Sequence, residues 1–119
     1  MKKTIVIGAT TNPERYAYKA VLKLMETGHE VVPVGIRKGK IAGLKINNGK
    51  PIENDVDTVS IYLSPATQVE WYSYILSLRP KRVIFNPGTE NAEFKHILNE
   101  NNIETEDACT LVLLSAGAY

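Results

Sequence analysis

The stretch from Thr4 to Tyr18 holds the residues of this chain that are best suited to bind a phosphate. The apolar, β-branched run from Thr4 to Ile7 is typical of a buried parallel strand, and Gly8 follows it directly. Asn12 and Pro13 are typical of the N-cap and first turn of a helix. A helix that begins just after a strand presents free N–H groups and the positive end of its dipole to an anion. These residues therefore predict a site for the pyrophosphate of a nucleotide.

The loop after this strand lacks the dinucleotide fingerprint G-x-G-x-x-G. Gly8, Thr10 and Pro13 stand at the positions of its three glycines, so only the first is present. Side-chain donors are plentiful instead, at Thr10, Thr11, Asn12, Arg15, Tyr16 and Tyr18. Arg15 suits a phosphate because its planar guanidinium can bind two oxygens at once.

The same loop resembles that of the small CoA-binding proteins with a Rossmann-like fold, whose sequence there runs roughly G-x-S-x-x-P-x-R-x-x-Y. The matching residues are Gly8, Thr10, Pro13, Arg15 and Tyr18, with Thr10 in place of the usual Ser. The resemblance continues through Pro33-Val34, Gly43-Leu44-Lys45 and Pro87-Gly88. It implies that the ligand is coenzyme A (CoA) or an acyl-CoA.

The end of the second predicted strand bears on the choice of cofactor. NAD-binding domains carry an acidic residue there to hold the ribose hydroxyls, whereas this chain has Val34 and Gly35. The cations Arg37, Lys38 and Lys40 follow. They suit a ribose that bears a phosphate, as in CoA or NADP, or they form a solvated basic loop. We expect Val34, Gly35 and Arg37 to lie beside the adenosine.

Two later turns fall at the same edge of the predicted sheet. Ser64-Pro65 repeats the pattern of a cap followed by proline, and Pro87-Gly88 forms a turn before Thr89, which can cap the next helix. Asp107 can cap the last helix in the same way. Any α/β protein needs such caps. Because open parallel sheets bind ligands at this edge, we also expect Ser64, Pro65, Pro87 and Gly88 to line the remainder of the site.

The sequence shows no catalytic constellation and no metal-ligand spacing. His29 and His96 have no evident carboxylate partner and are expected at the surface. Cys109 is either a small buried apolar residue or a thiol whose pKa is lowered at a helix N-terminus. The residues favour a binding protein. The alternative is an enzyme that uses the same crevice, either an NADP-dependent reductase or the nucleotide-binding part of an acyl-CoA ligase.

Strands and helices alternate along the chain. Strands are predicted at residues 4–7, 30–34, 56–62, 83–85 and 103–106, and helices after Pro13 and at residues 65–78, 90–100 and 110–118. This alternation predicts an α/β fold of one domain, residues 1–119: a three-layer, Rossmann-like, doubly wound parallel sheet of about five strands in the order 3-2-1-4-5. Residues 35–54 lack a helical period, so we expect short extended pieces around Lys40 to Ile46 and a turn at Asn48-Gly49.

Composition narrows the range of partners. The formal net charge is +1, the chain has one cysteine, and no apolar run approaches the length of a membrane span. We therefore expect a cytoplasmic protein that binds a small nucleotide rather than nucleic acid or a membrane. On the helix predicted at residues 65–78, Trp71, Tyr74 and Leu78 form a second apolar stripe. This stripe predicts a homodimer, unless another part of the same chain covers it.

Overall fold

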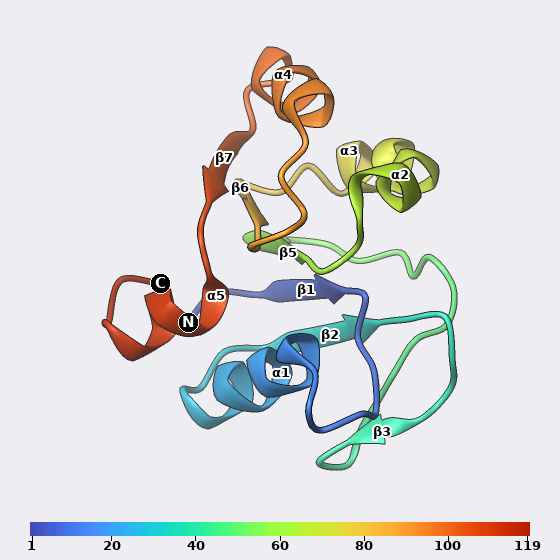
Figure 1. The fold of residues 1–119 in the computed structure, drawn as a ribbon, viewed down its shortest axis with the longest axis vertical. Coiled ribbons are helices and arrows are strands. Elements are labelled where there is room, and N and C mark those ends of the chain that lie inside the picture. The colour runs from blue at the N-terminus through green and yellow to red at the C-terminus, as the bar shows by residue number, and fades with distance from the viewer.

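Five parallel strands form the central sheet, in the spatial order β2-β1-β5-β6-β7 (Figure 1). The computed structural model describes residues 1–119. The strands of the sheet are β1 (Thr4–Ile7), β2 (Val31–Val34), β5 (Thr58–Ile61), β6 (Arg82–Phe85) and β7 (Glu104–Asp107). Every residue of β1, β2 and β5 is buried, as expected for strands that are covered on both faces. The predicted α/β fold class is confirmed.

Helices cover the sheet on both sides and make three layers. Helices α1 (Tyr16–Glu26) and α5 (Thr110–Ser115) pack against one face, where Val6, Leu24 and Leu114 belong to one apolar cluster. Helices α3 (Tyr72–Leu78) and α4 (Ala92–Glu100) pack against the other, where Phe85 and Phe94 meet edge to face. Neighbouring residues of a strand alternate between the two clusters because their side chains point to opposite faces.

The predicted strand order was wrong. Numbered along the chain, the five strands lie in the order 2-1-3-4-5, because β5 pairs with β1 instead of lying outside β2. The place outside β2 is taken by a single parallel bridge between Val34 and Asn47. All four residues of β5 are buried between two neighbouring strands, whereas Asn47 is only partly buried and lies at the edge. The fold is still doubly wound, in the other common order.

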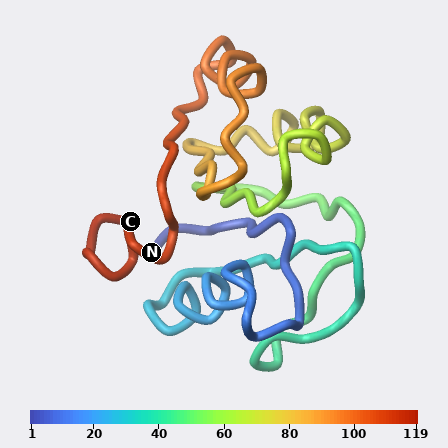
Figure 2. Tube along the Cα trace, in the orientation of Figure 1, coloured from blue at the N-terminus to red at the C-terminus, as the bar shows by residue number.

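The irregular connection after β2 contains a small hairpin. Strands β3 (Lys40–Ile41) and β4 (Leu44–Lys45) pair antiparallel, which confirms the short extended pieces expected there. The hairpin turns at Ala42 and Gly43, both with positive φ, and not at Asn48-Gly49. The connection then crosses to the far side of the sheet before β5, as the tube in Figure 2 shows.

The long helix predicted at residues 65–78 is interrupted. Helix α2 (Pro65–Gln68) continues as a 3₁₀ turn, η1 (Val69–Trp71), before α3 begins. A regular helix would turn Val69 inward, but 57% of its surface is exposed. Leu78, from the proposed dimer stripe, is buried in the core instead.

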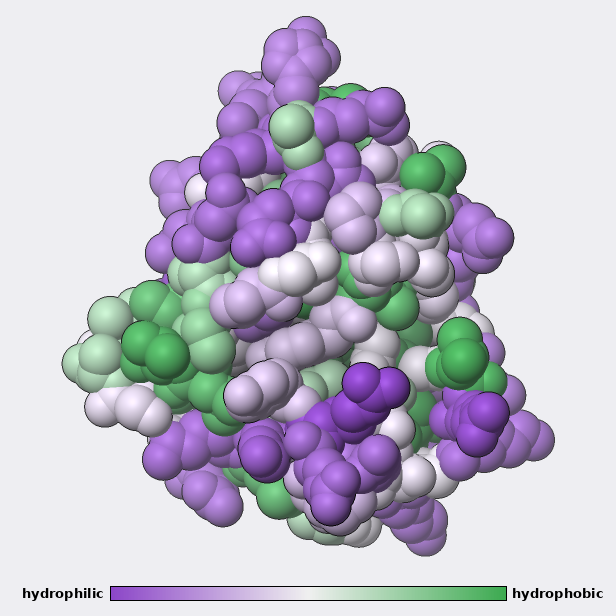
Figure 3. Space-filling model, viewed as in Figure 1, coloured by the Kyte–Doolittle hydropathy of each residue, from purple (hydrophilic) through white to green (hydrophobic).

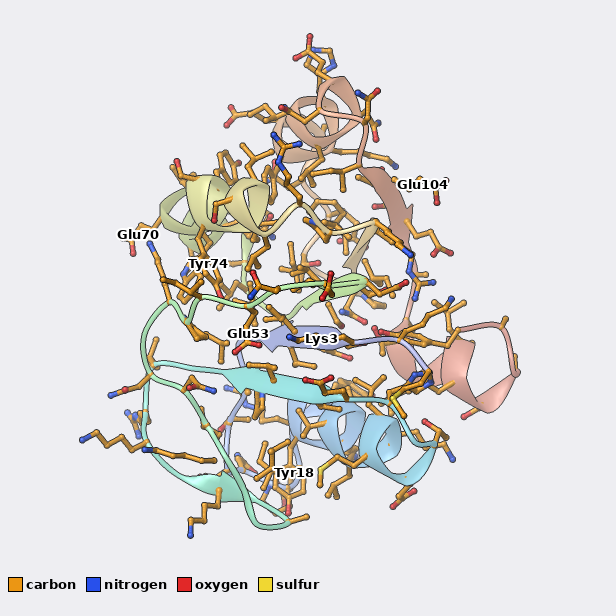
Figure 4. The ribbon with its side chains drawn as sticks, turned by 180° about the vertical axis from the view of Figure 1, so that it is seen from behind. Lys3, Tyr18, Glu53, Glu70, Tyr74 and Glu104 are labelled. Atoms are coloured by element: carbon orange, nitrogen blue, oxygen red, sulfur yellow. The ribbon has the colours of Figure 1, made fainter.

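The other two members of that stripe meet a segment of the same chain. The Tyr74 hydroxyl donates to the carbonyl oxygen of Pro51 over 2.6 Å, and the Lys50 ammonium lies 5.1 Å from the centre of the Trp71 ring. Figure 4 shows Tyr74 directed toward this segment. The stripe is therefore covered within the chain and does not require a second subunit.

Two predicted helix caps were also wrong. Asn91, not Thr89, caps α4, where its side-chain oxygen accepts from the Phe94 N–H over 3.0 Å. The Thr89 hydroxyl donates instead to the Asn86 carbonyl. Cys109, not Asp107, occupies the N-cap position of α5, because β7 extends through Asp107.

The two chain ends lie close together at the edge of the sheet where the strands begin (Figures 1 and 2). The Lys2 ammonium donates to the main-chain oxygen of Tyr119 over 2.6 Å, and His29 packs edge to face against the Tyr119 ring. At the same edge Lys3 pairs with Glu53 at 2.9 Å (Figure 4), and this hydrogen bond raises the pKa of the lysine.

Apolar side chains gather at the surface over α5 (Figure 3). None of the helices has the length and apolar character that a membrane crossing requires.

Candidate functional site

A cleft of about 910 Å³ runs across the ends of β2, β1 and β5, at the carboxyl edge of the sheet. This is the edge at which open parallel sheets bind ligands. The cleft brings together these predicted site residues: Gly8, Thr10, Thr11, Asn12, Arg15, Val34, Gly35 and Arg37.

The loop after β1 forms the middle of the cleft. Gly8 has a φ of +99°, and a Cβ there would lie 2.8 Å from the Tyr62 carbonyl oxygen, so the position requires glycine. The N–H groups of Gly8 and Ala9 both donate to the carbonyl of Val34 over 2.9 Å. These bonds hold the start of the loop against the end of β2.

The first helix begins later than its sequence predicts. Asn12 does not cap it; the Asn12 side chain accepts from the Glu14 N–H over 3.0 Å and closes a local turn through Pro13. Arg15 occupies the N-cap position instead, with no capping hydrogen bond from its side chain. The loop is therefore longer than predicted, and the N-cap of the helix is Arg15 rather than Asn12.

This helix end presents donors to the cleft. The first backbone bond of the helix runs from the Lys19 N–H to the Arg15 carbonyl, so the N–H groups of Tyr16, Ala17 and Tyr18 have no acceptor within the chain. Tyr16 and Ala17 line the cleft together with Arg15. Free N–H groups, the positive end of a helix dipole and a guanidinium are the elements of an anion site.

The loop after β2 forms one end of the cleft. A Cβ at Gly35 would lie 2.2 Å from the Ala9 carbonyl oxygen, so the two loops approach as closely as they do because residue 35 is glycine. Ile36 and Arg37 line the cleft, whereas Lys38 and Lys40 do not. Of the predicted basic loop, only Arg37 therefore belongs to the cleft wall.

The opposite end of the cleft was predicted only in part, because the turn at Ser64-Pro65 was placed at this edge but its neighbours were not named as site residues. It is formed by Tyr62, Leu63, Thr67 and Trp71, which follow β5 and extend into α2 and η1. Burial raises the pKa of Tyr62 to about 12, so its hydroxyl is neutral at physiological pH. The signal available in the sequence was their position after a buried strand. These residues lie next to the loop after β1 only because β5 pairs with β1.

The remaining predicted site residues lie outside the cleft wall. Pro13 lies in the turn of the first loop, and Tyr18 packs in the same cluster as Ile41 and near the β3–β4 hairpin (Figure 4). Ser64 and Pro65 start α2 as predicted, directly after Leu63 of the cleft. Pro87 and Gly88 follow β6, one strand beyond the cleft.

A buried polar network lies beside the cleft, at the ends of β5 and β6. The Asn86 amide donates to the Ser60 hydroxyl and its oxygen accepts from the Thr110 N–H, both over 2.9 Å. The Ser60 and Thr110 hydroxyls are 2.8 Å apart. The network joins the start of α5 to the sheet.

No group of three His, Cys, Asp or Glu side chains is placed to hold a metal ion.

Comparisons with known proteins agree with this geometry. The family described as the CoA binding domain matches residues 2–115. A solved structure of an uncharacterised protein is 55% identical, with a TM-score of 0.98, over 100% of this chain and 98% of that one. No curated protein matches the chain.

More distant structures share the fold. A protein from Thermus thermophilus is 24% identical, with a TM-score of 0.87, over 99% of this chain and 90% of its own. A dinucleotide-forming acetyl-coenzyme A synthetase from Candidatus Korarchaeum cryptofilum is 15% identical, with a TM-score of 0.72, over 90% of this chain and 25% of its own. With the family match extending over nearly its whole length, the chain belongs to the CoA-binding domain family.

Proposed function

We propose that this protein is a cytoplasmic binding protein for CoA or an acyl-CoA, which it holds in the cleft across β2, β1 and β5. The observation that carries the proposal is the order of chemical groups along the cleft. Arg37 stands at one end, the anion-binding loop with Arg15 lies in the middle, and Leu63 and Trp71 form the other end. CoA carries a ribose phosphate, a pyrophosphate and a pantetheine arm in the same order.

In this arrangement the pyrophosphate lies at the middle of the cleft. Arg15 and the backbone N–H groups of Thr10 and Thr11 bind it, joined by the free N–H groups of Tyr16 and Ala17 at the start of α1. Pro13 has no N–H, and the Asn12 N–H donates to the Thr10 hydroxyl. Thr10, Thr11 and Asn12 supply side-chain donors on the same wall. Pro13 fixes the turn of the loop, and Tyr18 supports it from the side of the β3–β4 hairpin.

The adenosine lies beside Val34, Gly35 and Arg37. Ile36, whose side chain is 83% exposed, provides an apolar surface for the base. No carboxylate stands at the end of β2 to accept from a free ribose diol, and Arg37 can bind a ribose phosphate. The pantetheine arm continues past Leu63 toward Ser64 and Pro65. The sulfur end of the arm then lies at Trp71, and we place Pro87 and Gly88 at the border of this end, at the neighbouring strand end.

The proposal is tested by calorimetric titration with CoA, dephospho-CoA, NADP and NAD. We expect CoA to bind about tenfold more tightly than dephospho-CoA, because a partly exposed phosphate contact contributes about 1 kcal/mol or somewhat more. NAD should bind poorly. Arg37→Ala should abolish the difference between CoA and dephospho-CoA, whereas Lys38→Ala, outside the cleft, should keep most of it.

Two other results would contradict the proposal. Tight binding of NADP with none of CoA would favour the reductase alternative. If mass spectrometry identifies a copurifying nucleotide other than CoA or an acyl-CoA, that nucleotide would replace CoA as the proposed ligand.

The predicted homodimer remains part of the proposal, although the stripe that suggested it is covered. Val69 on η1 and Val112 on α5 are the large apolar side chains still exposed on helices other than α1, at 57% and 63%. Sedimentation at high micromolar concentration tests self-association, and a monomer there would remove the dimer. Fractionation of cells tests the cytoplasmic location.

A further inference from the structure

The cleft ends in an apolar wall, formed by Leu63 and Trp71. We propose that this apolar wall binds the acyl group of an acyl-CoA, so that the protein prefers a short apolar acyl-CoA to free CoA. The inference rests on the proposed function, because it assumes that the nucleotide part of CoA occupies the rest of the cleft.

Trp71 is held in place from several sides. It packs against the larger apolar core, and the Tyr74 ring meets it edge to face at 5.7 Å between centroids. Tyr74 is itself fixed by its hydrogen bond to Pro51, and Lys50 lies over the Trp71 ring. An aromatic surface that is already ordered loses little conformational freedom on binding, which favours affinity for an apolar group.

The position of the apolar wall relative to the cations sets the orientation of the ligand. Arg37 follows β2 and the apolar wall follows β5, with the anion-binding loop of β1 between them. When the ribose phosphate lies at Arg37 and the pyrophosphate at Arg15, the sulfur end of CoA points toward Trp71. An acyl group on that sulfur then meets Leu63 and Trp71 rather than the basic end.

The polar groups at this end are few. Among the residues that line the cleft, the only carboxylate is Glu14, which belongs to the loop after β1. The Thr67 hydroxyl is engaged with that of Ser64 at 3.1 Å, and the Lys50 ammonium beside Trp71 donates to the Glu70 carbonyl oxygen over 2.7 Å. The Tyr62 hydroxyl is buried away from the surface. The lining therefore does not provide a dedicated partner for a polar acyl group, and an apolar acyl chain is the chemistry that it fits.

The single tryptophan of the chain makes the inference directly testable. We would titrate the wild-type protein with adenosine 3′,5′-bisphosphate, CoA and hexanoyl-CoA, following heat and tryptophan fluorescence. Hexanoyl-CoA should bind about tenfold more tightly than CoA, because each methylene fully removed from water strengthens binding about fourfold and the cleft is open on one side. It should also shift the emission to shorter wavelength. The bisphosphate lacks the arm and should bind without such a shift.

Two variants and a control separate the apolar wall from the rest of the cleft. Trp71→Ala should lower the affinity for hexanoyl-CoA about tenfold further than it lowers the affinity for CoA. Leu63→Ala should also lower the affinity for hexanoyl-CoA more than the affinity for CoA. This variant replaces Trp71→Ala in the test if Trp71→Ala does not fold. Val69→Ala lies on the same 3₁₀ turn but outside the cleft, so it should leave the preference unchanged.

Equal affinities for CoA and hexanoyl-CoA, with unchanged fluorescence, would overturn this inference and leave the proposed function standing. The same emission shift with the bisphosphate as with CoA would place the adenine at Trp71 and would also overturn it. If neither CoA nor hexanoyl-CoA binds, the proposed function fails together with the inference.

Discussion

Arg15 is the side chain that we propose to bind the ligand while it contributes little to the fold. It stands at the N-cap of α1, lines the cleft, and makes neither a capping bond nor an ion pair through its guanidinium. Arg15→Ala should weaken CoA binding by about 1.5–3 kcal/mol, the range for hydrogen bonds to charged groups. The free energy of unfolding in urea should stay within about 0.5 kcal/mol of wild type.

Lys81→Ala is the matched control for this loss of charge. Lys81 is exposed at the start of β6, at the edge of the sheet opposite the cleft. Its replacement should leave CoA affinity unchanged in the same calorimetric measurement. An equal loss of affinity in both variants would mean that Arg15 acts only through net charge.

Gly35 has the opposite role, because it is needed by the backbone rather than by the ligand. A Cβ at this position would lie 2.2 Å from the Ala9 carbonyl oxygen, so the loops after β1 and β2 would have to separate. Gly35→Ala should lower the free energy of unfolding by about 1–3 kcal/mol, as overpacking does in a well-packed core. Gly49→Ala, where a Cβ meets nothing within 4 Å, should change it much less. Urea unfolding compares the two.

At the scale of elements, α4 depends on its cap. The Asn91 oxygen accepts from the Phe94 N–H, and its amide donates to the Gln68 side chain over 3.0 Å and to the Tyr72 hydroxyl over 2.8 Å. Asn91→Ala should destabilise the protein by about 1–2 kcal/mol, since it removes a cap and leaves Gln68 with an unpaired oxygen. Asn48→Ala, at an exposed position, should have little effect in the same urea titration. Equal effects would contradict this role of the cap.

The interrupted helix α2–η1–α3 shows why helical periodicity was insufficient. A regular helix over residues 65–78 would have turned Val69 inward and left the Trp71–Tyr74 stripe for another subunit. The 3₁₀ turn instead exposes Val69 and brings Trp71 to the cleft, while Lys50 and Pro51 contact the stripe. Periodicity reports which residues are apolar on each face, but not which segment of the chain will cover that face.

At the scale of the whole molecule, the closure of the chain ends predicts a pH dependence. His29 Nδ1 accepts from the Lys2 N–H over 2.9 Å, so the bond requires that nitrogen to be unprotonated. Burial, followed by the positive charges of the N-terminus and Lys2, lowers the pKa of His29 in the folded protein. Below about pH 6.5 the unfolded chain therefore binds more protons than the folded one, and stability falls as the pH falls.

The urea midpoint should accordingly be lower at pH 5.5 than at pH 7.5. His29→Gln should reduce this difference. His96→Gln should keep it, because His96 is exposed on α4 and pairs only with Glu100. An unchanged pH dependence in His29→Gln would show that other groups cause it.

The sequence by itself determined the local elements and the character of the first loop. The strand Thr4–Ile7 is confirmed residue for residue, and Ser64-Pro65 start a helix as predicted, because these features depend on neighbours along the chain. Tertiary structure alone decided that β5 lies beside β1 and that α1 starts after Arg15. The strand order depends on which buried strand gains neighbours on both sides. The start of α1 depends on how the loop after β1 packs against Gly35. The Trp71 end of the cleft follows from that strand order, so no local pattern could have revealed it.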